Sequence, residues 1–250
     1  MLPDVYVLLE DKPRIRKSHL NMFKKCPHYY YLHCLKRIEE PQTFEAQLGQ
    51  LFHSWAKRFM MKLNPPLTRK DMQKMVPHDV LPELRDWMLW FIDVEWRRYS
   101  LLTQEGYEDY WKPVALEWHV EVEMEDYIAV GTIDRVDEDP AGGLIIIEYK
   151  TSRKPHLSRW RRELAFYSRI VEKLGYKVKY VAVILPSLRQ VVCETLKPVT
   201  FVFLEKLINR FLNAQRENLF PPKPGDQCIF CPARSLCKYA TEVHGDDTSS

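Results

Sequence analysis

Two consecutive strand patterns with charged residues at their ends constrain the fold of this chain more than any other feature. Gly131–Asp134 is followed, after a short turn, by the apolar run Leu144–Ile147 and then by Glu148, Tyr149 and Lys150. Successive side chains of a strand point to opposite faces, so Glu148 and Lys150 share a face and Tyr149 points away. The uniformly apolar run predicts a central strand that is buried on both faces.

Two carboxylates and a lysine at neighbouring strand ends suit metal-assisted hydrolysis. Asp134 and Glu148 are natural ligands for Mg²⁺ or Mn²⁺, which prefer oxygen, and the carbonyl oxygen of Tyr149 is a candidate further ligand. Lys150 is placed to orient or deprotonate a water molecule. The set predicts phosphodiester hydrolysis and hence a nucleic acid substrate. The alternative is a surface Glu–Lys pair, which the adjoining apolar run makes less attractive.

The remaining hydrophobic pattern predicts an α/β fold with a central mixed sheet flanked by helices. Helical spacing predicts a helix over 18–35, with Ser18 as N-cap and an interruption at Cys26-Pro27. It also predicts helices over 47–61, 81–101, 159–174 and 200–217. Strands are predicted over 114–124, 127–136, 144–151, 179–185 and 190–195. We expect the unit from 144 to 185 to be a right-handed parallel crossover.

The 250 residues, 46% of them hydrophobic, are enough to bury a sizeable core. No run of apolar residues predicts a transmembrane helix, and the first residues do not resemble a signal peptide, so a cytoplasmic location is expected. We expect one domain over 1–240, made of a helical part at 14–112, a core at 113–217 and a C-terminal segment at 218–240. Residues 241–250 are expected to form a flexible tail.

The net charge of +3 is mild, but the charges are unevenly distributed. Basic residues gather over 12–37 and 153–162, and acidic residues crowd 117–139. A basic rim around an acidic centre suits a polyanion held over metal ions, although ordinary solvated charge would give the same pattern. The candidate phosphate contacts are Arg14, Lys17, Arg161 and Arg162.

Three of the six cysteines follow a ligand-like spacing near the C-terminus: Cys228-x2-Cys231-x5-Cys237. Because cytosolic thiols stay reduced, metal or cluster ligation is a better interpretation than disulfides. Zinc or an iron–sulfur cluster requires a fourth ligand. Cys34 is a weaker candidate for that position, and Cys193 lies in a predicted strand and is expected to be buried.

The strand sequences G-T-I-D-R-V-D at 131–137 and I-I-I-E-Y-K-T-S at 145–152 resemble the PD-(D/E)XK nuclease superfamily, in particular its RecB-like branch. The resemblance implies a restriction-endonuclease-like core. It also implies that Asp134 and Glu148 bind the metal and that Lys150 is catalytic.

Two further motifs of that branch have counterparts on predicted helices. The segment 49–53 matches G-x-x-x-H, which implies that His53 is a metal ligand. The Q-x-x-x-Y motif corresponds to 163–167, so Tyr167 fits but Glu163 replaces glutamine and its role is open. Glu117, on the preceding strand, is either a second acid of the site or an exposed residue.

The cysteines resemble those of the iron–sulfur RecB-like nucleases, which include the AddB nuclease and CRISPR-associated RecB-like adaptation nucleases. That group places one cysteine before the core and three after it, and Cys26-Pro27 followed by Tyr29–Leu32 resembles the first motif. The resemblance implies a [4Fe–4S] cluster on Cys26, Cys228, Cys231 and Cys237. A structural Zn²⁺ on four cysteines is the alternative.

Together these features predict a metal-dependent DNA nuclease. The resemblance favours a single-strand exonuclease that acts in DNA repair and recombination or in CRISPR adaptation, with protein partners in such a complex and no membrane association. A catalytically inactive DNA-binding or scaffold protein of the same fold and a zinc-stabilised interaction module are the alternatives.

Overall fold

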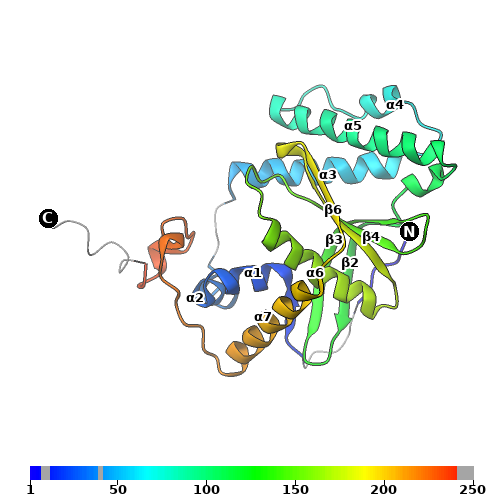
Figure 1. The fold of residues 1–250 in the computed structure, drawn as a ribbon. Helices are drawn as coiled ribbons and strands as arrows, with labels where there is room; N and C mark the ends of the chain where they lie inside the picture. Colours follow the sequence, from blue (N-terminus) through cyan, green and yellow to red (C-terminus); the bar gives the residue numbers. More distant parts are fainter. Residues whose placement is uncertain (7–11, 39–41, 241–250) are drawn as a thin grey trace.

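The computed structural model describes residues 1–6, 12–38 and 42–240, which form a six-stranded mixed sheet with helices on both faces (Figure 1). The strand order is β1 (Arg14–Arg16), β3 (Ile128–Glu138), β4 (Leu144–Tyr149), β5 (Val178–Leu185) and β6 (Gln190–Glu194), with β2 (Ala115–Glu123) also paired to β3. The predicted α/β class and mixed sheet are confirmed. The predicted tail at 241–250 lies outside the described residues.

The edges of β3 are divided among three partners. β2 pairs antiparallel with β3 over residues 128–136. The opposite edge is shared by β1, parallel at 128–130, and β4, antiparallel at 135–138. Among the described strands, none pairs with residues 131–134 on that second edge. The sheet therefore opens beside the segment that carries Gly131 and Asp134.

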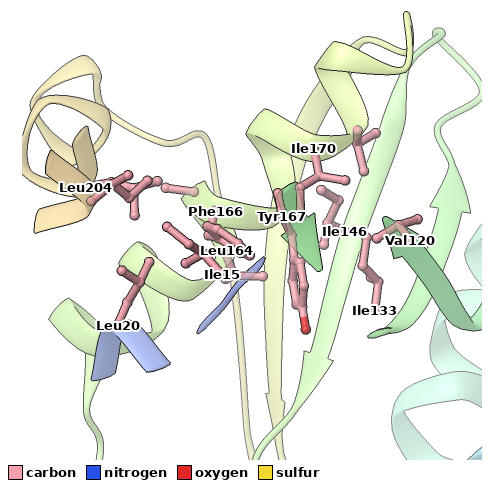
Figure 2. Close-up of a cluster of buried hydrophobic side chains, with 14 of the residues drawn as sticks. Ile15, Leu20, Val120, Ile133, Ile146, Leu164, Phe166, Tyr167, Ile170 and Leu204 are labelled. Carbon is pink, nitrogen blue, oxygen red and sulfur yellow. The ribbon is translucent and has the colours of Figure 1, made fainter. Parts of the chain in front are cut away.

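Helices α1 (Lys17–Lys25), α6 (Leu157–Lys173) and α7 (Pro198–Arg216) lie on one side of the sheet (Figure 1). The predicted apolar positions of α6, Leu164 and Tyr167 among them, are buried against Ile133 and Ile146 of the sheet (Figure 2). Because β4 and β5 are parallel, α6 forms the crossover between them, as its position in the sequence predicts.

Helices α3 (Phe44–Lys62), α4 (Arg69–Lys74) and α5 (Pro82–Gln104) cover the other side (Figure 1). Thr43 caps α3 by accepting a hydrogen bond from the backbone N–H of Ala46 at 3.2 Å. The core here is aromatic: Phe52 and Phe91 meet the ring of Tyr149 edge to face, with centroids 5.9 and 5.7 Å away. Such pairs add to the free energy of apolar burial.

The helix predicted over 18–35 is divided. α1 ends at Lys25, Cys26 is extended, and α2 (Pro27–Tyr30) continues into a π-helical turn at Tyr31–Leu35. Proline disfavours helical conformation in the residue before it, which explains the extended Cys26. Ser18 is not the N-cap, because the helix begins at Lys17. β1 and α4 were not predicted, since elements this short carry no periodic signal.

The remaining helical segments are short 3₁₀ turns at Glu108–Trp111, Pro186–Leu188, Asp226–Cys228 and Arg234–Leu236. None of the helices in the described ranges combines the length and the apolar character that a membrane span requires.

A buried charge network joins α5 to the sheet. Arg135 of β3 is fully buried and donates to Glu95 of α5 at 2.6 Å and to Asp137 at 2.7 Å. Arg98, one turn beyond Glu95, lies 2.8 Å from Asp137. In this network the desolvated charges compensate one another, so removal of one carboxylate leaves an excess of buried positive charge.

We expect Glu95→Ala to lower the free energy of unfolding by about 3–5 kcal/mol, because Arg135 stays buried and loses a partner. Asp86→Ala, an exposed acid on the same helix, is the matched control and should change stability little. Thermal unfolding followed by circular dichroism measures both. Equal melting temperatures for the two variants would contradict a stabilising role for the network.

Candidate active site

The opening beside β3 faces a pocket of about 720 Å³. Lys17 of α1, His53 of α3, Asp134 of β3, and Glu148 and Lys150 at the end of β4 all line it. The structure thus brings together five charged or titratable residues that are up to 133 positions apart in the sequence.

Asp134 is held between β4 and α3. One carboxylate oxygen, Oδ2, accepts a hydrogen bond from the backbone N–H of Tyr149 at 2.8 Å, and the other lies 3.5 Å from His53 Nδ1. Burial acts to raise the pKa of Asp134, but His53 and Lys17 outweigh it and lower the pKa. Asp134 is therefore ionised near neutral pH, as a ligand for a hard cation must be.

Glu148 is 1% exposed, and its two oxygen atoms differ. Oε2 accepts hydrogen bonds from Lys17 Nζ at 2.6 Å and Lys150 Nζ at 2.9 Å. Oε1 is buried and has no hydrogen-bond partner among the described residues. A buried carboxylate oxygen without a partner is energetically costly, and coordination of a divalent cation by this oxygen would offset that cost.

Lys150 lies between two carboxylates, Glu148 and Glu163, and its Nζ is 2.8 Å from Glu163 Oε2. Burial acts to lower the pKa of Lys150, but Glu148 and Glu163 outweigh it and raise the pKa. In this arrangement Lys150 is a fixed ammonium group. It can stabilise negative charge on a phosphate or orient a water molecule.

Glu163 of α6 contacts Lys150 with one carboxylate oxygen and two further residues, Asn21 and Arg159, with the other. Its Oε1 accepts hydrogen bonds from Asn21 Nδ2 at 2.7 Å and Arg159 Nε at 2.8 Å. Burial acts to raise the pKa of Glu163, but Lys150, Lys17 and Arg159 lower it to about 2. The side chain is thus an ionised partner for Lys150, a charge that glutamine in this position would not provide.

Glu117 of β2 completes a group of possible metal ligands on the α3 side. Ligand atoms of His53, Glu117 and Asp134 lie within 4.8 Å of one another. Burial acts to lower the pKa of His53, but Asp134 raises it, and burial followed by Asp134 raises the pKa of Glu117. These three residues, together with the unpaired oxygen of Glu148, fit the oxygen and imidazole donors that Mg²⁺ or Mn²⁺ accepts.

The backbone at Glu117 explains why sequence reasoning left this residue undecided. Its φ is 49°, a value uncommon for a residue other than glycine and often found at functional sites. Leu116 packs in the α3–α5 core, whereas Trp118 packs in the α1–α6 core. The regular alternation of faces that a strand over 114–124 implies is therefore interrupted at Glu117, and no residue type there signals the reversal.

Tyr167 of α6 packs against the segment of β3 that leads to Asp134. Its hydroxyl donates to the backbone oxygen of Thr132 at 2.6 Å, and Lys17 Nζ lies 4.6 Å from the centroid of its ring. A Cβ atom added to Gly131 would lie 2.4 Å from Tyr167 Cε1. Gly131 is therefore required for this ring to reach the strand beside Asp134.

Three of the four predicted phosphate contacts lie away from the lining of this pocket. Arg14 pairs with Glu121, and Arg161 forms two hydrogen bonds to Glu194, at 2.5 and 2.7 Å. Arg162 donates to Asn21 at 3.1 Å and lines a neighbouring depression. Of the four predicted contacts, the structure places Lys17 in the pocket itself.

The C-terminal segment lies beside α2 (Figure 1). Four cysteines, Cys26, Cys228, Cys231 and Cys237, line one small cavity of about 20 Å³ there. Within the described ranges, no three of their sulfur atoms lie within 4.8 Å of one another. Cys193 is exposed on β6, contrary to the prediction that it is buried.

An opened sheet edge with converging carboxylates, a histidine and a lysine defines a metal-dependent hydrolase. The family model described as the PD-(D/E)XK nuclease superfamily matches residues 17–238, so the chain belongs to this superfamily of nucleases that use divalent metal ions. The restriction-endonuclease-like core predicted from sequence is consistent with this match.

Other comparisons add little. A crystal structure of SSO0001 aligns over 92% of this chain and 88% of that chain, with 13% sequence identity and a TM-score of 0.42. A likeness at this level carries no argument about the chain. No curated protein matches the sequence.

We expect Gly131→Ala to destabilise the protein by about 1–3 kcal/mol, because the added methyl group overlaps the buried Tyr167 ring. In a Tyr167→Leu background the same substitution should cost less, since the overlapping ring carbon is gone. A double-mutant cycle of thermal unfolding measures this coupling. Additive effects of the two substitutions would show that the contact does not limit residue 131.

Proposed function

We propose that this chain is a divalent-metal-dependent DNA exonuclease that acts on single strands or free DNA ends. The observation that carries the proposal is the convergence of Asp134, Glu148 and Lys150 in one open pocket, with Glu148 Oε1 buried and unpaired. Membership of a nuclease superfamily supports the reaction class. DNA as the substrate and the exonuclease mode rest on the resemblance to RecB-like nucleases.

The proposed ligands are Asp134 and Glu148, with His53 and the carbonyl oxygen of Tyr149 on the two sides and Glu117 as an additional acid. A bound Mg²⁺ or Mn²⁺ would lower the pKa of a water molecule and neutralise charge on the phosphate. Asp134 is oriented for this role by the backbone N–H of Tyr149. His53 is oriented by α3, where Gly49 allows a close approach to Thr151.

Lys150 is proposed to be the catalytic lysine. Its ammonium group, fixed between Glu148 and Glu163, can donate a hydrogen bond to the attacking water or to a phosphate oxygen. Lys17 contacts the same Glu148 oxygen and is proposed to bind phosphate once a metal ion competes for that carboxylate. Tyr167 is proposed to position Lys17 and the strand that carries Asp134.

The rim of the pocket supports an unpaired strand as substrate. Phe44 lines the pocket and is 58% exposed. An exposed ring beside a phosphate-binding site can stack an unpaired base. DNA repair or recombination and CRISPR adaptation are the proposed contexts, each of which supplies DNA ends and partner proteins.

We expect Lys150→Ala and Asp134→Ala each to reduce cleavage at least about 100-fold while the protein remains folded. Lys154→Ala, an exposed lysine four residues from Lys150, is the matched control and should cleave at nearly the wild-type rate. The assay is digestion of end-labelled single- and double-stranded DNA with Mg²⁺ or Mn²⁺. Full activity of Lys150→Ala would refute its role, and an inactive wild type would favour a DNA-binding or scaffold protein.

The exonuclease mode has its own measurement. Circular and linear single strands of the same sequence present the same phosphodiester bonds but differ in free ends. We expect the linear strand to be degraded and the circle to resist. Equal rates on both would replace the exonuclease with an endonuclease.

We also propose that Cys26, Cys228, Cys231 and Cys237 hold a [4Fe–4S] cluster. All four cysteines line one small cavity, which supports ligation of a single group by all of them. The resemblance to the iron–sulfur RecB-like nucleases favours the cluster over zinc, which four cysteines would also accept. Ligation would tie α2 to the C-terminal segment and restrict the unfolded chain over about 200 residues.

We expect Cys26→Ser to lose iron and the broad visible absorption of the wild type and to melt at a lower temperature. Cys193→Ser, exposed on β6, is the control and should keep both. Iron, zinc and labile sulfide contents are measured on protein purified without oxygen. Stoichiometric zinc in a colourless wild type would replace the cluster with a zinc site.

A further inference from the structure

Two further depressions lie next to the active-site pocket on the surface. The first, of about 460 Å³ between α1 and α6, shares Arg159 with the active-site pocket. It also shares Lys24, Ser158 and Arg162 with a pocket of about 650 Å³ between α6, β6 and α7. We call these two depressions together the α6–α7 groove. The three hollows are therefore neighbours in a row from the candidate active site to α7.

The α6–α7 groove is strongly basic. Six of the thirteen residues that line its larger pocket are Lys24, Arg161, Arg162, Lys197, Lys206 and Arg210. The acid in that lining, Glu194, is already neutralised by its two hydrogen bonds from Arg161. The lining of the smaller depression contains lysine and arginine but no acid. This balance complements a polyanion.

Two cations at the centre of the groove are crowded. Lys24 and Arg162 both line the two pockets of the groove. Burial lowers the pKa of Arg162, opposed by Glu163 and reinforced by Arg159. The Nε atom of Arg162 is buried and lacks a hydrogen-bond partner within the part of the chain that the structure describes. An anion bound between these side chains would satisfy that donor and offset the repulsion.

An exposed aromatic ring lies in the same pocket. Phe203 is 63% exposed, and Lys206 and Arg210 follow it at i+3 and i+7 on α7, so all three lie on one face of the helix. Arg210 is roughly 10 Å farther along the helix axis. An aromatic platform flanked by cations is the arrangement that binds an unpaired base together with its phosphates. The bases of a duplex are already stacked and do not offer a free face to this ring.

We infer that the α6–α7 groove binds a single strand of DNA that extends from the active site, with phosphates at Lys24 and Arg162 and a base on Phe203. The inference rests on the proposed nuclease function, because the position of the groove next to the active site, with Arg159 lining both, is what selects a nucleic acid over another polyanion. Lys206 and Arg210 would contact the next phosphates along α7.

The test compares the binding of two fluorescent oligothymidylates, of 4 and 15 nucleotides, in EDTA so that no cleavage occurs. Only the longer strand can occupy both the active site and the groove. For Phe203→Ala, we expect the affinity ratio of the long to the short strand to fall about tenfold. Phe203→Trp should retain the ratio. The control is Tyr107→Ala, which removes a 45% exposed ring just after α5, outside the three pockets. This substitution should not change the ratio.

The phosphate contacts are tested by salt dependence. For the 15-nucleotide strand, Lys206→Gln combined with Arg210→Gln should reduce the slope of log affinity against log salt by about 1.4, since each phosphate contact on a single strand contributes about 0.7. Lys70→Gln combined with Arg97→Gln removes two exposed charges outside these three pockets and should leave the slope unchanged.

An unchanged affinity ratio in Phe203→Ala, or equal losses in the groove and control variants, would overturn the inference. So would a duplex whose binding depends on Phe203 as strongly as that of the single strand. Failure of the proposed function looks different, because the wild type would then not cleave DNA under any metal condition.

Discussion

The site depends on one constraint: a single edge of β3 is shared by β1 and β4, and neither pairs with residues 131–134. A backbone edge in the middle of a sheet would ordinarily be covered by a neighbouring strand. Here the uncovered segment carries Asp134, and the end of β4 brings Glu148 and Lys150 to the same opening. The space that a continuous ladder would fill is available to a metal ion and a phosphate.

Each side of the sheet stabilises this opening differently. On the α3–α5 side, Arg135, the residue after Asp134, forms ion pairs with Glu95 and Asp137. These ion pairs fix the position of β3 at the site. On the α1–α6 side, Lys17 and Lys150 neutralise Glu148, and Tyr167 packs against Gly131. Cations from several distant elements thus lie within hydrogen-bonding distance of Glu148 in a largely buried setting.

Glu163, at a position where the resemblance to RecB-like nucleases implies a glutamine, fits this electrostatic arrangement. A glutamine could orient Lys150, but a carboxylate also compensates its charge and that of Arg159. Glu163 thereby reduces the electrostatic repulsion among the basic side chains of α6 beside the site. In the same region Lys24 and Arg162 have fewer acidic partners, which separates the charge-balanced active site from the positively charged groove next to it.

Much of the site was predictable because local sequence carries it. Strand alternation places Glu148 and Lys150 together and Tyr149 opposite, as observed, and the spacing of Trp160, Leu164 and Tyr167 predicts the buried face of α6. The positive φ at Glu117 and the short strand β1 were not predicted, because neither leaves a periodic signal in the sequence, whereas the break at Cys26 follows from the proline after it. The sequence by itself determined which residues can bind a metal ion and which faces are apolar, since both follow from side-chain chemistry and periodicity. Only the tertiary structure decided that β1 and β4 divide one edge of β3, because strand pairing is a long-range choice that no local pattern encodes.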